Sequence, residues 1–269
     1  MKKLFFMGFA LLLCAMWPAD AAAQLKIGGR KLNTGKLLEA GKDVAKAVTL
    51  SDKDIAQLSC EAVEWMDANN PIADETTEYG ARLKRLTEGI TEINGLPLNF
   101  KVYHVVDVNA FACGDGSIRV FSALMDLMDD DELMAIIGHE IGHVVHADVK
   151  HAMKNAYLSS ATRNAAGAAE GSTLAKLSDS QLGEVVTAFT GAQFSQKQEY
   201  EADEYGFEFS VKNGFSRYGM GNSLNKLVEL SKGAKSSTVQ KMFSSHPDSE
   251  KRAARMKEKA DAYVAAHQQ

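Results

Sequence analysis

The sequence has 269 residues, of which 45% are hydrophobic and 24% are charged, and its formal net charge is −5 at pH 7. This composition is typical of a globular protein, and the length fits one domain of ordinary size with extra segments. The mild excess of acidic residues gives no reason to expect a nucleic acid or an anionic membrane surface as a partner.

The first 23 residues have the pattern of a secretory signal peptide. Two lysines precede an apolar stretch at residues 4–17, and the alanines at 21–23 form a typical cleavage site before Gln24. The apolar stretch is short for a membrane span, so we expect no transmembrane segment in the mature chain. Cys14 follows a leucine inside this stretch, whereas a lipid-bearing cysteine would follow a small residue at its end. The sequence therefore predicts a periplasmic or secreted protein rather than a lipid-anchored one.

After the signal peptide we expect a loosely ordered N-terminal segment at residues 24–51 and one globular domain at residues 52–269. The segment is rich in Lys and Gly and has no clear pattern. The domain keeps two cysteines, Cys60 and Cys113. Free thiols are a liability in an oxidising compartment, so we expect a Cys60–Cys113 disulfide in preference to two buried thiols.

Two amphipathic helices are predicted in the first part of the domain. The first covers residues 52–67. The second has apolar residues at three- and four-residue steps from Tyr79 to Ile93. We expect Asp74 to cap it and Asn94-Gly95 to end it.

Strands are predicted next. Residues 100–106 are rich in β-branched and aromatic side chains, and residues 109–112 and 117–121 flank a Gly-Asp-Gly turn signal. Together they predict a small antiparallel sheet. Its edge strand, Asn109-Ala110-Phe111-Ala112, can pair with the backbone of an extended peptide. A purely structural sheet would have the same pattern.

The stretch from His139 to His143 has the pattern H-E-x-x-H. Residues four apart on a helix share one face, so His139 and His143 can bind one tetrahedral Zn²⁺. Glu140 points in another direction, but it can reach a water at the metal and act as a general base. The alternative is a helix with two surface histidines that bind nothing.

The helix that carries this pattern is predicted to begin after Asp129, which forms a capping box with Glu132. Gly142 lies between the two histidines and costs roughly 1 kcal/mol of helix propensity relative to Ala. We therefore expect the backbone of a neighbouring element close to Gly142. His146 is two turns from His139 and is expected outside the site.

A region rich in Ala, Gly and Ser follows, at about residues 152–191. It is either a mobile lid or a plain connection. Residues 195–212 are then predicted to form a second site helix, in which Glu199 and Asp203 share a face. Glu199 can supply a third metal ligand, and Asp203 can accept a hydrogen bond from a ligand imidazole. A solvated acidic face is the alternative.

Two more helices are predicted, at residues 216–231 and 251–265. His246-Pro247 precedes the last of them. A single histidine before proline is more often a turn residue than a ligand, and the pattern alone favours that interpretation.

The order and spacing of the two motifs resemble the HtpX and CAAX-prenyl-protease group of zinc peptidases, in which H-E-x-x-H is followed by E-x-x-x-D. The similarity covers the chain from about Leu50 to its C-terminus. Its further matches are Asn109-Ala110-Phe111-Ala112, Ser122 to Asp126, Phe194-Ser195-Gln196 and His246-Pro247.

The resemblance implies a gluzincin fold, an α+β class that is mainly helical, with a small antiparallel sheet lining the active-site cleft. It implies one Zn²⁺ per chain, bound by His139, His143 and Glu199. It also implies that His246 lies near the metal, where it either guards the open coordination position or stabilises the oxyanion. Arg252 matches a basic residue with a weak supporting role.

Residues 52–269 would then be a metallopeptidase domain. We predict an endopeptidase that hydrolyses unfolded or misassembled cell-envelope proteins, because an edge strand needs an accessible substrate backbone. The resemblance also implies association with outer-membrane assembly or with other envelope proteases. The alternative is a zinc-stabilised, chaperone-like binding protein or a latent peptidase, in which His246 closes off the metal.

Overall fold

The computed structural model describes residues 26–27, 30–31, 50–163, 177–233, 245–247 and 249–267. The predicted signal peptide, with Cys14, and nearly all of the predicted N-terminal segment at residues 24–51 lie outside the described residues. Within that segment, two short strands pair in antiparallel orientation. They are β1 (Lys26–Ile27) and β2 (Arg30–Lys31).

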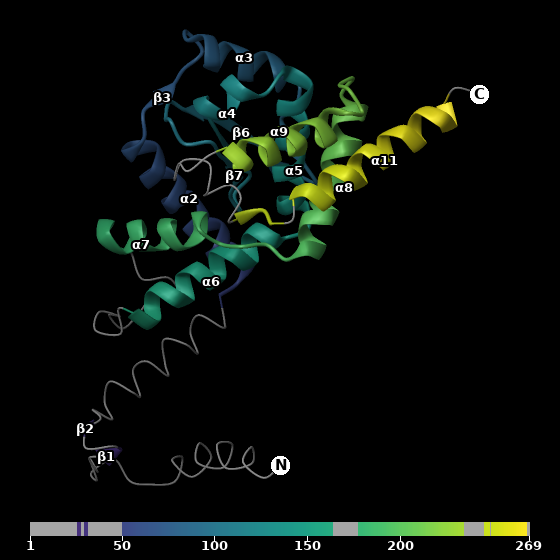
Figure 1. Cartoon of the computed structure of the whole chain (residues 1–269). Helices are drawn as coiled ribbons and strands as arrows, with labels where there is room; N and C mark the ends of the chain where they lie inside the picture. Colours follow the sequence, from purple (N-terminus) through teal and green to yellow (C-terminus); the bar gives the residue numbers. More distant parts are fainter. Residues whose placement is uncertain are drawn as a thin grey trace, which may run out of the picture.

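The domain is mainly helical, as predicted, and the helix with the H-E-x-x-H pattern, α5, contacts α6, α8, α9 and the sheet (Figure 1). The helices predicted at residues 52–67, 195–212, 216–231 and 251–265 closely match α2, α8, α9 and α11. In the described part of the chain the helices are α2 (Asp52–Asn69), α3 (Glu78–Leu86), α4 (Ser122–Leu127), α5 (Asp130–Val145), α6 (Asp148–Arg163), α7 (Asp179–Thr190), α8 (Gln196–Lys212), α9 (Gly219–Gly233) and α11 (Ser249–His267).

The alanine-rich region, predicted as either a lid or a connection, contains most of α6 and all of α7, which pack against each other and against α2. Residues 164–176 between them lie outside the described residues. Over the described ranges, no helix combines the length and the apolar character that crossing a bilayer requires.

A four-stranded sheet with the order β3-β6-β8-β7 packs against α5. Strands β7 (Ala110–Ala112) and β8 (Ser117–Phe121) form the predicted antiparallel hairpin, and β7 is an edge strand, as predicted. The prediction of an antiparallel sheet is wrong, because β6 (Asn99–Tyr103) pairs with β8 in parallel. After residues 104–109, β7 does not pair with β6. The next strand, β8, lies between β6 and β7 instead. At the other edge, β3 (Ile72–Ala73) is antiparallel to β6.

The second predicted helix is shorter than expected, because α3 ends at Leu86 instead of continuing to Ile93. Asn94 and Gly95 have φ values of 51° and 77° and form a hairpin turn. Asn-Gly with positive φ at both residues is a preferred two-residue hairpin turn, so local turn chemistry overrides the helical spacing before it. The hairpin joins β4 (Glu92–Ile93) to β5 (Leu96–Pro97).

Side-chain caps start the helices that carry the site. Asp129 and Glu132 form the predicted capping box of α5, and Ser195 caps α8 in the same way. Each cap stabilises its helix by about 1 kcal/mol, because it satisfies backbone N–H groups that have no partner in the first turn. The predicted cap of α3 is wrong: Thr77 caps that helix, and the Asp74 carboxylate closes a turn two residues along the chain instead.

A partly buried ion pair joins α2 to the sheet. Arg119, in the middle of β8, is 1% exposed and donates from Nε and Nη2 to both carboxylate oxygens of Asp67, at 2.9 and 3.1 Å. Lys101 and Tyr103 of β6 donate to the same carboxylate. Removing Asp67 would leave the guanidinium of Arg119, which is 1% exposed, without its carboxylate partner. The network therefore holds β6 and β8 in place behind the edge strand.

Glycines let α8 approach α5 closely. A Cβ atom on Gly142 would lie 3.0 Å from Ala202 Cα, which confirms the expected close backbone at this position. A Cβ atom on Gly206 of α8 would lie 2.8 Å from Ala135 O and 2.9 Å from His139 N. These are backbone atoms, which cannot rotate away as the end of a side chain can. The crossing distance is therefore constrained, and it places the acidic residues of α8 beside the histidines of α5.

The two cysteines of the domain are free thiols in the described part of the chain. Cys113 is fully buried, whereas Cys60 lies on the exposed face of α2 and donates its S–H group to Asp115 at 3.6 Å. The expected Cys60–Cys113 disulfide is therefore not formed in this structure, because α2 turns Cys60 toward solvent and Asp115.

Replacing Gly206 by Ala is expected to push α8 away from α5, because the added methyl group meets backbone atoms. Overpacking of this kind lowers the free energy of unfolding by about 1–3 kcal/mol, and it also moves Glu199 and Asp203 away from the histidines. Urea unfolding and zinc titration measure the two effects. The control is Gly183→Ala in α7, where the nearest atoms belong to the Trp65 side chain, from 3.3 Å. Equal stability and zinc affinity of the two variants would contradict this expectation.

Candidate metal centre

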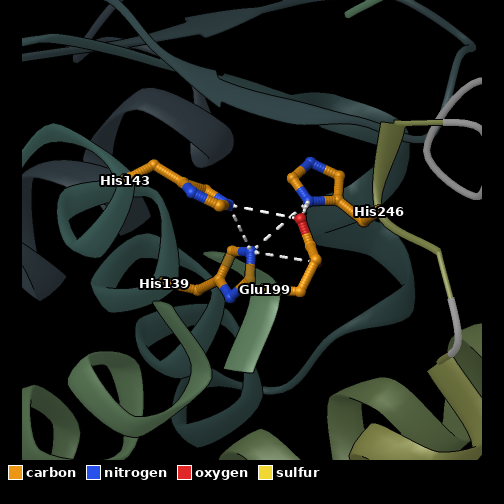
Figure 2. A group of neighbouring side chains, drawn as sticks. All are labelled: His139, His143, Glu199 and His246. Carbon is orange, nitrogen blue, oxygen red and sulfur yellow. Dashed lines mark hydrogen bonds and ion pairs between the residues drawn. The ribbon is translucent and has the colours of Figure 1, made fainter. Parts of the chain in front are cut away.

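The histidines of α5 meet the first acidic residue of α8 in the interior of the domain (Figure 2). The Nε2 atoms of His139 and His143 are 3.1 Å apart. Glu199 Oε1 lies 3.4 Å from His143 Nε2, and Glu199 Oε2 lies 3.8 Å from His139 Nε2. None of the three residues is more than 4% exposed. The structure thus brings together the three residues that were predicted to bind the metal.

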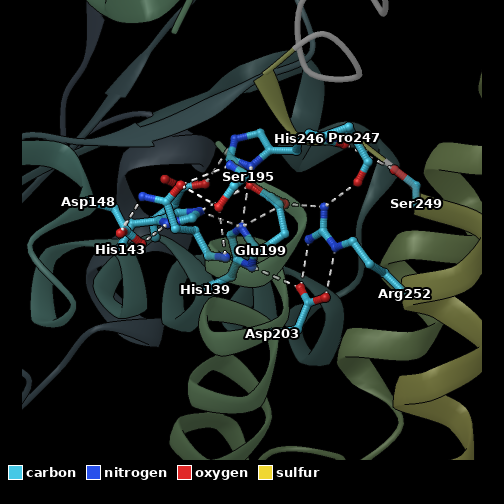
Figure 3. A network of polar contacts seen from close by, with 12 residues as sticks. His139, His143, Asp148, Ser195, Glu199, Asp203, His246, Pro247, Ser249 and Arg252 are labelled. Carbon is cyan, nitrogen blue, oxygen red and sulfur yellow. Dashed lines mark hydrogen bonds and ion pairs between the residues drawn. The ribbon is translucent and has the colours of Figure 1, made fainter. Parts of the chain in front are cut away.

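Each histidine is held by its own carboxylate (Figure 3). His139 Nδ1–H donates to Asp203 Oδ1, as predicted, and His143 Nδ1–H donates to Asp148 Oδ2, both at 2.9 Å. A ring that donates from Nδ1 presents a lone pair at Nε2. The carboxylates therefore orient both Nε2 atoms toward one point.

The donor atoms fit a metal ion. Two lone pairs that face each other at 3.1 Å repel, unless a cation or a shared proton lies between them. Two ligands of one tetrahedral Zn²⁺, with bonds of about 2.0–2.1 Å, lie roughly 3.3–3.4 Å apart. The separations between the two histidines and Glu199 are close to that value, so a small divalent cation satisfies groups that otherwise oppose each other.

A proton on His143 competes with a metal for this position. Burial lowers the pKa of His143, but the hydrogen bonds to Asp148 and Glu199 outweigh burial and raise the pKa to about 9. Burial dominates at His139 and lowers its pKa. Burial raises the pKa of Glu199, but His246 and the histidine hydrogen bonds hold it well below its usual range. A metal ion bound here would compete with this proton at neutral pH, so metal affinity would fall as the pH falls.

Arg252 of α11 fixes the acidic residues of α8. It is 1% exposed, donates to Asp203 Oδ2 and Oδ1 at 2.7 and 2.6 Å, and forms an ion pair with Glu199. Bidentate pairing holds a carboxylate in one orientation. These contacts are more extensive than the weak supporting role that the resemblance implied for Arg252.

His246 lies in the short stretch before α11 and contacts the cluster through Nδ1 (Figure 2). This atom is 3.0 Å from Glu199 Oε1 and 3.4 Å from His139 Nε2. A backbone hydrogen bond from Phe194 N to Ser245 O, 3.2 Å long, holds the stretch in place. His246 is therefore not a simple turn residue. One donor atom from each of four residues lies within 4.8 Å of the others: His139, His143, Glu199 and His246.

Glu140 lies beside this cluster. It is 2% exposed, and its Oε1 atom has no hydrogen-bond partner within the described ranges. His246 Nε2 is 3.8 Å from that oxygen, which is too far for a hydrogen bond. A buried oxygen without a partner costs about 1–3 kcal/mol. The unpaired oxygen therefore does not stabilise the fold, but it can contact a water or a substrate.

A pocket of about 350 Å³, its open mouth included, is lined by Glu140 and by the edge strand β7. Asn109, one of its lining residues, has a buried Oδ1 atom that accepts no hydrogen bond from the described residues. The carbonyl oxygen of an amide accepts hydrogen bonds, so this atom is satisfied only when a donor reaches it. The pocket is lined by Asn109, Ala110, Phe111, Ala112, Glu140, Val149, Phe189, Thr190, Ala192, Phe194, Ser245 and His246.

Comparison with known proteins gives the family of the chain. Residues 79–260 match peptidase family M48, and this stretch contains the whole cluster. The chain belongs to peptidase family M48. It is 40% identical to the metalloprotease LoiP of Escherichia coli (strain K12) over 249 residues, which are 92% of this chain and 97% of LoiP. The metalloprotease YcaL of the same organism is 37% identical over 229 residues, 85% of this chain and 88% of YcaL.

A third M48 relative is much longer than this chain. The beta-barrel assembly-enhancing protease of Escherichia coli (strain K12) is 30% identical over 175 residues, which are 61% of this chain but 35% of that protein. The likeness therefore extends over about a third of the longer protein. The predicted resemblance to this group of peptidases is confirmed.

Two contacts of the M48 centre were not predicted from the sequence. Asp148 lies outside both motifs, and Gln198 Nε2 donates to its Oδ1 atom at 2.6 Å. Ala147, with a φ of 62°, reverses the chain between α5 and α6 and returns Asp148 to the ring of His143. Phe194 stacks on that ring, with centroids 4.0 Å apart. No motif marks Ala147 as left-handed, so the sequence has no signal for this contact.

Replacing Asp148 by Asn is expected to weaken zinc binding about 10- to 100-fold, because a neutral amide orients and polarises His143 less well than a carboxylate does. Competition with a chromogenic chelator measures the affinity. The control is Glu201→Gln, which removes an exposed carboxylate of α8 outside the cluster. If both variants bound zinc equally well, Asp148 would have no part in the centre.

Proposed function

We propose that this M48 peptidase is a zinc-dependent endopeptidase that hydrolyses unfolded or misassembled proteins of the cell envelope. One observation carries the proposal. His139, His143 and Glu199 converge on one point, and the carboxylate of Glu140 lies beside them without a hydrogen-bond partner on Oε1 within the described residues. Three protein ligands beside a free base are typical of catalytic zinc sites.

The ligand types support zinc as the ion, with one ion per chain. Two imidazoles and one carboxylate suit zinc, whereas calcium and magnesium prefer sites made of oxygen atoms. The hydrogen bonds to Asp203 and Asp148 strengthen this preference, because they make the imidazoles better donors.

Each residue of the site has its own role in the proposed reaction. A bound Zn²⁺ would lower the pKa of a water ligand toward about 7 and polarise the scissile carbonyl. Glu140 accepts the proton of the attacking water and then delivers it to the leaving amine. Asp203 and Asp148 keep both ring ligands in the tautomer that presents Nε2. Arg252 holds Asp203 ionised, because its hydrogen bonds outweigh the effect of burial and lower the Asp203 pKa.

The substrate lies extended along the edge strand from Asn109 to Ala112. Backbone hydrogen bonds to an edge strand give affinity with little dependence on sequence. The unpaired Oδ1 atom of Asn109 supports this placement, since a peptide N–H would satisfy it. A folded domain has no free backbone of this kind, so unfolded or misassembled polypeptides are the substrates.

The proposed place of action is the periplasm. The predicted signal peptide at residues 1–23 supports export, and the position of Cys14 argues against a lipid anchor. Residues 24–51 would follow as a loosely ordered segment and residues 52–269 as the metallopeptidase domain. The name of the beta-barrel assembly-enhancing protease supports an envelope setting, with association with outer-membrane assembly or with other envelope proteases.

A second candidate is a latent peptidase or a zinc-stabilised, chaperone-like protein in which His246 closes the metal site. The observation that favours it is the 3.0 Å distance between His246 Nδ1 and Glu199 Oε1, within the four-donor cluster. Four protein donors are typical of structural zinc sites. Glu140 favours the peptidase, because a structural site has no use for a base.

Replacing Glu140 by Gln is expected to leave zinc bound and to lower the hydrolysis of denatured casein by at least about 10²-fold, because the base is lost. The substitution is made both in the wild-type chain and in the His246→Ala chain. Elemental analysis gives the zinc content of each protein, and the casein assay gives its rate of hydrolysis. Stability should be retained, since the substitution preserves shape and removes a poorly paired carboxylate. Cleavage at the parental rate would refute the role of Glu140 as the base.

Replacing His246 by Ala is expected to raise casein hydrolysis severalfold while zinc stays bound, because three ligands remain and the fourth position opens. Elemental analysis and the casein assay of both proteins measure the two effects. Zinc in both proteins with cleavage by neither would support the chaperone-like candidate. Slower cleavage by the variant would instead assign His246 to the stabilisation of the oxyanion.

A further inference from the structure

The carboxylate that binds the ring of His143 is itself bound by a side chain of α8. Asp148 Oδ2 accepts a hydrogen bond from His143 Nδ1 at 2.9 Å, and its other oxygen, Oδ1, accepts one from Gln198 Nε2 at 2.6 Å (Figure 3 shows Asp148 beside His143). One donor on each oxygen holds the plane of the carboxylate toward the ring. Asp148 begins α6 and Gln198 lies in the first turn of α8, so this contact also joins the two helices.

Gln198 uses both ends of its amide. Its Oε1 atom accepts hydrogen bonds from Ser195 N and Ser195 Oγ, at 2.9 and 2.8 Å, and so closes the capping box of α8. A backbone N–H can only donate and an ionised carboxylate can only accept, so the amide has one possible orientation, with Nε2 toward Asp148. A glutamate would cap the helix equally well and would suit the helix dipole, but it has no hydrogen to donate. The contact with Asp148, and not the cap, therefore requires an amide.

The other ligand histidine is held in the same manner by a residue of another type. His139 donates to Asp203, and Arg252 binds both oxygens of that carboxylate. The guanidinium fixes the orientation of Asp203 and offsets its charge. Gln198 is neutral, so it fixes the orientation of Asp148 and leaves the negative charge of that carboxylate for the ring N–H that it binds.

We infer that Gln198 is a positioning residue of the metal centre, because its amide holds Asp148 and Asp148 in turn holds the ring of His143. The inference rests on the proposed zinc site and goes beyond it, since Gln198 is not one of the four donors and does not line the pocket along β7. Gln198 directly precedes Glu199 in the first turn of α8. The start of this helix thus supplies one ligand and the support of a second.

The first test measures the exchange of two imidazole protons with solvent. The full chain with isotope-labelled histidine is loaded with zinc, and NMR gives the exchange rates of the Nδ1–H protons of His143 and His139. Gln198→Met has a similar length but lacks both polar ends, so Asp148 leaves the ring more often. The His143 proton should then exchange about fivefold faster, an effect of the size of one lost hydrogen bond. The His139 proton should keep its rate.

The second test measures zinc affinity by competition with a chromogenic chelator. Gln198→Met is expected to weaken zinc binding about 3- to 10-fold, which is less than the loss expected for a carboxylate that binds the ring directly. Gln198→Ala, a good helix former, is the second variant if Gln198→Met does not fold.

Two controls separate this role from helix capping. Ser195→Ala weakens the same cap but keeps the hydrogen bond from Gln198 to Asp148, so both exchange rates and the zinc affinity should equal those of wild type. Gln181→Met is the same substitution at the matching position of α7, a helix that contributes no residue to the cluster. General loosening of α8 would speed the exchange of both protons, because Asp203 also lies on α8.

A double-mutant cycle decides whether Gln198 acts through Asp148. In the Asp148→Ala chain Gln198 has no carboxylate to hold, so Gln198→Met should change zinc affinity there by less than about twofold. The full loss of affinity in that chain, or equal His143 exchange rates in Gln198→Met and Ser195→Ala, would overturn the inference and leave the zinc site intact. A wild-type chain that binds no zinc would overturn the proposed function, and the inference with it.

Discussion

The close crossing of α5 and α8 is the constraint on which the centre depends. His139 and Asp203 are 64 residues apart in the chain, yet their side chains meet at 2.9 Å. Productive geometry at such a site tolerates shifts of only about 0.5 Å. Gly142 and Gly206 make the crossing possible, although glycine within a helix costs about 1 kcal/mol relative to alanine. The sequence thus has residues of low helix propensity at the crossing of α5 and α8, which positions the side chains of the cluster.

Charge explains why a buried centre of this kind is stable. Glu199, Asp203 and Asp148 contact the two histidines, and all three carboxyl pKa values are lowered, because hydrogen bonds and nearby charges outweigh burial. Arg252 supplies one positive charge against them. With the carboxylate of Glu140 beside the cluster, the excess is three negative charges, and one divalent cation would offset two of them. A proton on His143 would offset part of this excess in the absence of a metal, so a proton and a metal ion would serve the same role.

Several features that local chemistry decides were predicted correctly from the sequence, although the cap of α3 and the Asn94-Gly95 hairpin were not. The capping box at Asp129, the shared face of Glu199 and Asp203, and the hairpin before β8 each depend on residues a few positions apart. Features that distant contacts decide were not. The parallel pairing of β6 with β8 depends on which strand reaches the sheet interior, and the contact of Asp148 depends on the left-handed turn at Ala147. Both are tertiary outcomes without a local signature.

His246 lies where the four-donor cluster meets the pockets beside Glu140. Its Nδ1 atom contacts Glu199, while the same side chain lines the pockets on both sides of Glu140. A peptide bound along β7, as proposed, would meet His246 beside Glu140, so His246 and the scissile segment would exclude each other there. A purely structural site would gain nothing by burying Glu140 at a cost of about 1–3 kcal/mol. The cost of this unpaired oxygen is explained if the space beside Glu140 holds the peptide bond that is hydrolysed.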